Sequence, residues 1–205
     1  MKLVNLEELH VSGNRLTSLP SEIGKLVNLK KLWVSRNQIT SLPSEIGKLV
    51  NLKELHVFNN QLTSLPSEIG KLVNLKVLDV SENQLTSLPP EIGELVNLKE
   101  LHVFNNKLTS LPSEIGLLRN LNHLSYSNNP IEYIPPQVQR LIDRLRNNGQ
   151  EVYRDKQSVH NSGIQTSFKE TVSRLSNKKP ELNIHQTVEE VLESSLLDDS
   201  KKSIV

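Results

Sequence analysis

The chain contains no cysteine, few aromatic residues and almost no net charge. Without cysteine it cannot form a disulfide, use a thiolate for catalysis or bind zinc through sulfur. Its 24 basic and 23 acidic side chains nearly cancel, so it lacks the strongly basic surface that binds nucleic acid or an anionic membrane. No apolar run approaches the length of about 18 residues that suggests a bilayer-spanning helix. The sequence therefore predicts neither a nucleic-acid partner nor a membrane-embedded protein.

What the chain does contain is a repeated unit. Asn5 opens a segment that recurs with a constant period of 23 residues, and one copy reads NLKELHVFNNQLTSLPSEIGKLV. Such a strict period indicates a repeat architecture in which each unit stacks on its neighbours. The first asparagines of the six copies are Asn5, Asn28, Asn51, Asn74, Asn97 and Asn120.

The first half of each unit follows the pattern LxxLxLxxN, with leucines alternating with polar residues as in a strand. We expect the strands to pair in a parallel sheet and the leucines to form one continuous core. The last asparagine of the pattern lies where the chain leaves the strand, and its amide can satisfy backbone groups of the bend. We interpret this column as a structural asparagine ladder of Asn14, Asn37, Asn60, Asn83, Asn106 and Asn129.

The second half of each unit, LTSLPSEIGKL, predicts a short helical turn on the opposite, convex side. In the first copy, Pro20 ends the strand, Ser21 and Glu22 begin the turn, and Gly24 closes it. Because these turns are short, we expect the solenoid to curve only gently, with its parallel strands on the concave face.

The segment LPSEIGKLVNLKELHV at residues 42–57 resembles the leucine-rich-repeat proteins with 23-residue repeats. It is most similar to Ras-group repeat proteins, Scribble-type scaffolds and the repeat regions attached to Roc-type GTPases. The resemblance covers about two-thirds of the chain, by the count of matching repeats. It implies an α/β leucine-rich-repeat solenoid that binds proteins. The stretch VHNSGIQTSF at residues 159–168 is also similar to the tails of repeat proteins predicted in giant viruses and protists.

Three regions follow from these patterns. Residues 1–134 are expected to form about six repeats, and residues 135–149 a capping helix with Val138, Leu141, Ile142 and Leu145 on one face. Residues 150–205 are polar and are expected to be a partly helical extension, with helices near residues 164–175 and 187–196; alternatively, they open a second helical domain.

Met1–Val4 match the end of a repeat, which suggests a fragment of a longer scaffold or signalling protein, or else a natural chain whose end dimerises or tolerates exposure.

The polar and aromatic residues of the strand pattern should face solvent on the concave side. The single Trp and two of the three Phe fall at these positions, and exposed aromatic residues are typical of binding hot spots. We expect Trp33, Phe58 and Phe104 to anchor a partner. The residues expected to face solvent on the concave side are Glu8, His10, Ser12, Gly13, Lys31, Trp33, Ser35, Arg36, Glu54, His56, Phe58, Asn59, Val77, Asp79, Ser81, Glu82, Glu100, His102, Phe104, Asn105, His123, Ser125, Ser127 and Asn128.

Among the same set, Arg36, His56, Asp79, Glu82 and His102 are expected to orient the partner. A different interpretation is that the third and fifth repeats descend from a 46-residue duplication, so that HVFNN recurs by inheritance. His56 and His102 lie two repeats apart, about 10 Å at the usual strand spacing, which is too far for them to share a metal ion. We expect no metal and no cofactor.

The function that these features favour is a protein-interaction module and not an enzyme. The alternative is the substrate-recognition arm of a larger GTPase, kinase or ubiquitin ligase whose catalytic domain is absent. A phosphate-binding loop needs Ser or Thr after Gly-Lys, but Leu49 follows Gly47-Lys48. An open strand face offers no enclosed pocket for catalysis. The lack of cap cysteines and of a recognisable secretion signal favours a cytoplasmic location.

Overall fold

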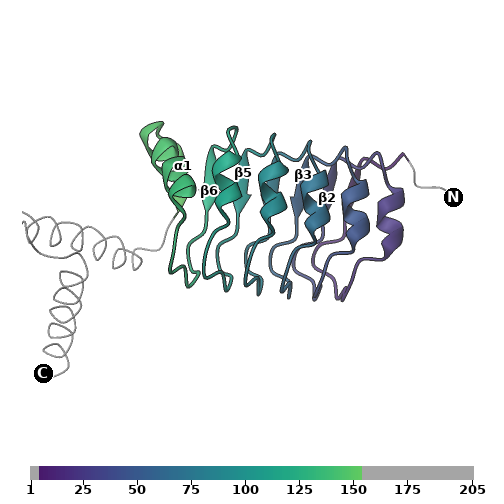
Figure 1. Ribbon diagram of the computed structural model, residues 1–205. Coiled ribbons are helices and arrows are strands. Elements are labelled where there is room, and N and C mark those ends of the chain that lie inside the picture. The colour runs from purple at the N-terminus through teal and green to yellow at the C-terminus, as the bar shows by residue number, and fades with distance from the viewer. Residues whose placement is uncertain (1–4, 154–205) are drawn as a thin grey trace, which may run out of the picture. The chain divides into compact units, whose positions relative to one another are not determined.

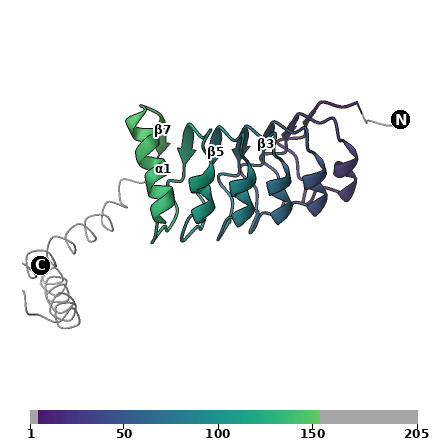
Figure 2. The same cartoon turned by 45° about the horizontal axis from the view of Figure 1, so that its top comes forward.

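The computed structural model describes residues 5–153, which form a stack of similar strand-and-turn units (Figure 1). Seven parallel strands make one sheet in sequence order, and the sheet is open and uncurled (Figure 2). This arrangement confirms the predicted leucine-rich-repeat solenoid. The strands are β1 (Glu8–His10), β2 (Lys31–Trp33), β3 (Glu54–His56), β4 (Val77–Asp79), β5 (Glu100–His102), β6 (His123–Ser125) and β7 (Glu151–Tyr153).

The repeat period sets the register of the sheet. Leu9 is paired with Leu32, Leu32 with Leu55, and the same step continues to Leu124. Each leucine thus stacks on its counterpart, and those of β2 to β6 are fully buried. Because side chains alternate across a strand, the residues on either side of each leucine point to the opposite surface. We call that outer surface of the sheet the strand face.

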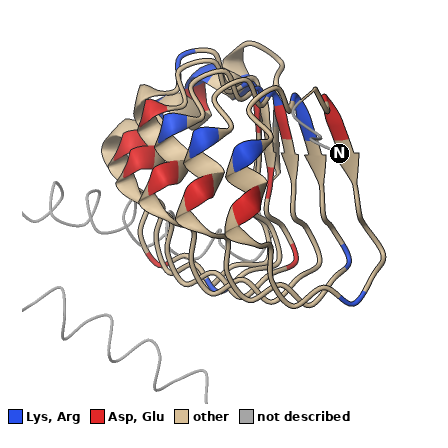
Figure 3. Ribbon diagram, turned by 90° about the vertical axis from the view of Figure 1, so that its right-hand side faces the viewer, with Lys and Arg blue, Asp and Glu red and all other residues tan. Residues whose placement is uncertain are grey.

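A 3-10 helix packs on the other side of the core in each of five units, as the short convex turn predicted from the sequence. The residue before each helix is a proline in an extended conformation. Acidic and basic residues recur at equivalent positions of these helices, where the ribbon is red and blue in Figure 3. They are η1 (Ser21–Lys25), η2 (Ser44–Lys48), η3 (Ser67–Lys71), η4 (Pro90–Glu94) and η5 (Ser113–Leu117).

The glycine in these helices has a different role from the one expected. Gly24 was expected to close its turn, but among the described glycines only Gly13 and Gly149 have positive φ. A Cβ on Gly24 would lie 2.9 Å from Cβ of Glu45 in the next unit, and one on Gly47 would lie 2.8 Å from Cβ of Glu68. The glycine therefore permits close packing of neighbouring helices rather than a left-handed cap.

Helix α1 (Pro136–Asn147) packs against η5 at the end of the array. It buries Val138, Leu141, Ile142 and Leu145, which is the apolar face that the sequence pattern indicates. The chain then returns to the sheet, where Val152 of β7 is paired with Leu124. The sequence pattern did not predict this last strand, because its residues lack the repeat motif.

The helices expected near residues 164–175 and 187–196 lie outside the described residues. Within residues 5–153, no helix combines the length and the apolar character that crossing a membrane requires.

Candidate functional site

The strand face brings most of the predicted binding residues into adjacent columns. Trp33, His56, Asp79 and His102 end four successive strands and are paired with one another in that order. Phe58 and Phe104 come two residues after His56 and His102. Arg36 and Glu82 are exposed, and they follow Trp33 and Asp79 by three residues.

The burial of these side chains differs from the expectation in two respects. Trp33, Phe58 and Phe104 are half-buried rather than fully solvent-facing, although none of them enters the leucine core. Ser35 and Ser81, which were expected on the open surface, are each only 1% exposed, and Ser125 is buried as well. Ser12, at the equivalent position of the first unit, is exposed, so the residue type alone does not decide the burial.

Ring contacts divide the strand face into two aromatic clusters. The ring centroids of His10 and Trp33 lie 3.6 Å apart, and those of Trp33 and His56 lie 5.7 Å apart. At the other end of the sheet, His123 lies 4.5 Å from His102 and 5.4 Å from Tyr153. The sequence pattern did not point to Tyr153, since it belongs to the unpredicted strand β7.

The first cluster surrounds a pocket of about 360 Å³ that is lined by His10, Ser12, Trp33, Ser35, His56 and Phe58. Nε1 of Trp33 and Oγ of Ser35 are buried there and have no hydrogen-bond partner among the described residues. Two unsatisfied polar atoms in one place are unusual, because burying such a group without a partner costs about 1–3 kcal/mol. This pocket is the most distinctive feature of the strand face.

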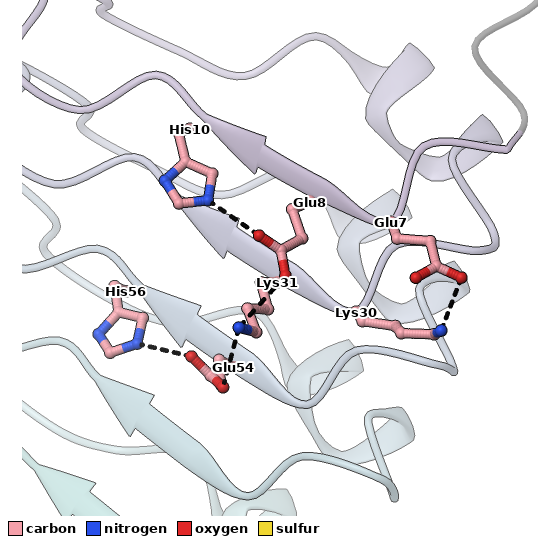
Figure 4. Close-up of polar contacts among 7 residues, drawn as sticks. All are labelled: Glu7, Glu8, His10, Lys30, Lys31, Glu54 and His56. Carbon is pink, nitrogen blue, oxygen red and sulfur yellow. Dashed lines mark hydrogen bonds and ion pairs between the residues drawn. The ribbon is translucent and has the colours of Figure 1, made fainter.

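Charged side chains at the amino ends of the first strands pair with one another (Figure 4). Nζ of Lys31 lies 3.2 Å from a carboxylate oxygen of Glu8 and 3.9 Å from one of Glu54. The hydrogen bond between Lys31 and Glu8 lowers the pKa of Glu8 and raises the pKa of Lys31. His10 and His56 lie 3.5 and 3.7 Å from Glu8 and Glu54. The acidic groups beside the pocket are thus already engaged.

Arg36 lies beside Phe58, one of the residues that line the pocket. Its guanidinium carbon lies 5.7 Å from the centre of the Phe58 ring, a cation–π contact. Its backbone φ is +55°, and Glu82 has the same left-handed conformation with a φ of +52°. The corresponding residues of other units are Gly13, Asn59, Asn105 and Asn128, types that adopt this conformation more readily.

The asparagines that end the strand pattern connect neighbouring units. Nδ2 of Asn83 donates to the carbonyls of Val57, Val80 and Ser81 at 3.0–3.1 Å, while its Oδ1 accepts from the amide of Leu62 at 2.9 Å. Asn37, Asn60, Asn106 and Asn129 repeat this geometry. Asn14 is exposed and donates only within its own unit, to Val11 and Ser12.

A second asparagine column was not recognised from the sequence. Asn51 donates to the carbonyl of Val27 at 2.9 Å, and Asn74 donates to that of Val50 at 2.8 Å. Asn97 and Asn120 make the same bond to the units before them. The recurrence of asparagine at the start of each unit could have indicated these hydrogen bonds. In the sequence it only marked the period, since an exposed asparagine suggests no particular partner.

His10, His56, His102 and His123 lie along the strand face. Among residues 5–153 there is no group of three His, Asp or Glu side chains that could hold a metal ion. Asp79, which lies between His56 and His102 in the sheet, accepts hydrogen bonds from Oγ and the amide of Ser81 at 2.5 and 3.1 Å.

Two family models match this chain. One, described as a leucine-rich repeat region, matches residues 45–147, and the other, described as two copies of leucine-rich repeats, matches residues 4–48. Neither describes a catalytic family. No curated protein matches the chain.

Solved structures with the same fold include a leucine-rich-repeat protein of Leptospira interrogans, with 39% sequence identity over 67% of this chain and a TM-score of 0.53. An internalin of Listeria monocytogenes is 26% identical over 72% of the chain, with a TM-score of 0.56. The structure of PEPR1–AtPEP1 includes a chain that is 28% identical over 63% of the present chain, with a TM-score of 0.59. The present chain spans only 41%, 40% and 19% of the lengths of these proteins. The closer resemblance to Ras-group, Scribble-type, Roc-associated or giant-virus proteins stays a prediction.

Proposed function

Because the chain belongs to the leucine-rich-repeat family, whose domains generally mediate protein–protein interaction, we propose that it binds a protein partner on the strand face. Trp33, Phe58 and Phe104 are the proposed anchors. Arg36, His56, Asp79, Glu82 and His102 orient the partner around them. No catalytic family matches the chain, which supports an interaction module without chemistry of its own.

The observation that carries this proposal is the pocket around Trp33. Half-buried aromatic rings line it, and two polar atoms within it have no partner among residues 5–153. A bound partner would bury the remaining ring surface and can supply the missing hydrogen bonds. Both changes favour binding, and hot spots are characteristically aromatic side chains at the centre of such a surface.

Left-handed backbone at Arg36 and Glu82 supports the same surface. Holding a residue other than Gly, Asn or Asp in this conformation costs about 1–2 kcal/mol. Strained backbone of this kind clusters at binding sites, where the side chain contributes something that a less strained residue does not. A partner that contacts both side chains would account for their presence.

The wider setting of the module is also a proposal. We propose that it acts in a cytoplasmic scaffold or signalling protein, on the basis of its cysteine-free composition.

The experiment compares capture of proteins by the wild-type chain and by a variant with Trp33→Ala, Phe58→Ala and Phe104→Ala, with quantitative mass spectrometry of the bound fraction. The variant should lose the main partner while keeping the wild-type circular dichroism spectrum. Val27→Ala, Val50→Ala and Val73→Ala provide the matched control. These valines are 45–46% exposed and lie outside the strand face, so their loss should leave capture intact. Undiminished capture by the aromatic variant would refute the proposal.

A further inference from the structure

Among residues 5–153, the buried side-chain atoms without a hydrogen-bond partner are Nε1 of Trp33 and Oγ of Ser35. We propose that the pocket between β1 and β3 binds a carboxylate carried by the protein partner, with Trp33 and Ser35 donating to it and Arg36 balancing its charge. This inference rests on the proposed function and specifies the chemistry that the surface recognises.

The two unpartnered atoms determine which kind of group fits. Nε1 of a tryptophan can only donate a hydrogen bond, whereas the hydroxyl of a serine can both donate and accept, so the tryptophan sets the requirement for an acceptor. Both atoms are buried, and Ser35 as a whole is 1% exposed. An acceptor oxygen is therefore the group that satisfies the pair, and a carboxylate brings two such oxygens with a full negative charge.

The equivalent position just after β4 shows how such a serine is satisfied inside the molecule. Ser81 stands where Ser35 stands, 46 residues on, and is equally buried at 1% exposed. Its Oγ donates to Oδ1 of Asp79 at 2.5 Å. At the position of Asp79, the second unit carries Trp33, which offers no acceptor. A carboxylate from a partner would therefore supply to Ser35 what Asp79 supplies to Ser81.

The charges around the pocket favour an anion at this end of the strands. Arg36 contacts the ring of Phe58, a wall of the pocket, and it makes no ion pair with any residue in the described part of the chain. Its neighbours in the same column, Gly13 and Asn59, are uncharged. Glu8 and Glu54 begin their strands, and their carboxylates are paired with Lys31 and with His10 and His56, two of the rings that line the pocket.

The volume of the pocket limits the group that the partner inserts to one side chain or a chain terminus. A volume of about 360 Å³ is near the lower end of ligand pockets. Aromatic walls can hold the apolar stem of this group while the carboxylate reaches the two donors. Entry requires a lining side chain to turn aside, because both donor atoms are shielded from solvent. His10 is the exposed ring among them and lies against Trp33.

The test uses Trp33 as its own reporter, since it is the only tryptophan in the chain. The full chain is titrated with phenylacetate, and the indole N–H resonance and the tryptophan fluorescence are followed. Phenylacetate should shift the indole resonance in a saturable manner, whereas phenethylamine, of similar shape but opposite charge, should not. Equal or stronger binding of phenethylamine would overturn the proposal, as would no response to phenylacetate.

A pair of matched variants separates the pocket from a general effect on the fold. Ser35→Ala should weaken phenylacetate binding about fivefold, as expected for one hydrogen bond, and Arg36→Gln should weaken it about threefold. Ser81→Ala should leave the affinity unchanged, because that hydroxyl is already held by Asp79 and does not line the pocket. Equal affinities of the Ser35 and Ser81 variants would contradict the assignment of the donor.

The failures of the two proposals can be told apart. If partner capture is lost in the triple aromatic variant but is unchanged by Ser35→Ala with Arg36→Gln, the strand face binds a protein without carboxylate recognition, and the present inference is wrong. If phenylacetate binds as described while the triple variant still captures its partner, the pocket is real and the proposed anchors are wrong.

Discussion

At the scale of single residues, the asparagine ladder shows how one side chain replaces several missing backbone bonds. Asn83 is 8% exposed and bonds with four backbone groups in two adjoining units. Because these groups are buried, nothing else can satisfy them when the amide is removed. Asn14, at the first described unit, is exposed and has only two bonds of this kind.

The substitution Asn83→Ala should therefore lower the free energy of unfolding by about 1–3 kcal/mol, as measured by urea denaturation. Asn14→Ala, its matched control, should cost less than about 1 kcal/mol, because water reaches the groups it leaves. Equal losses in the two variants would show that the bonds between units contribute little.

Arg36 offers a second test at this scale. Replacing it with asparagine relieves the left-handed backbone and should raise the free energy of unfolding by about 0.5–1 kcal/mol. The same change removes the unpaired cation, so partner capture should weaken while the fold becomes more stable. A variant that is more stable and still binds fully would mean that Arg36 is tolerated rather than used.

At the scale of elements, neighbouring 3-10 helices approach so closely that only glycine fits between them. A Cβ at Gly47 would lie 2.8 Å from Cβ of Glu68 and 2.9 Å from its carbonyl oxygen. The carbonyl belongs to the backbone, so relief requires two units to separate. The spacing of the whole convex side thus depends on this column of glycines.

Gly47→Ala is expected to destabilise the protein by about 1–3 kcal/mol, the usual cost of overpacking. Gly13→Asn is the matched control, since a Cβ there meets nothing within 4 Å and Asn59 adopts the same left-handed conformation. It should change the melting temperature little. Similar losses for both variants would show that crowding between neighbouring helices is not the cause.

Helix α1 gives the second prediction for an element. Leu145 is completely buried against the last unit, so Leu145→Ala should cost about 2–5 kcal/mol in a denaturation experiment. Arg146, its exposed neighbour, should tolerate alanine within about 0.5 kcal/mol. A small effect at Leu145 would indicate that the last unit is stable without the helix.

At the scale of the whole molecule, each unit contacts only its neighbours, so stability is the sum of local terms along the stack. Leu9 and Val11 of the first unit are half-buried, whereas Leu55 and Val57 of the third are 0% exposed. In this chain the first unit should open most readily. Amide hydrogen exchange should therefore be fastest around β1 and slowest around β3 to β5, and uniform protection would contradict this picture.

The sequence by itself was enough to predict the repeats, the parallel sheet, the leucine core, the convex turns and the apolar face of the last helix, because a strict period requires equivalent residues to stack. Only the tertiary structure decided how deeply Trp33 and Ser35 are buried, why Gly24 is a glycine, and that residues 151–153 form a seventh strand. These features arise where side chains of adjoining units meet. These features depend on the distance between units and on the rotation of side-chain rings, and the sequence pattern specifies neither.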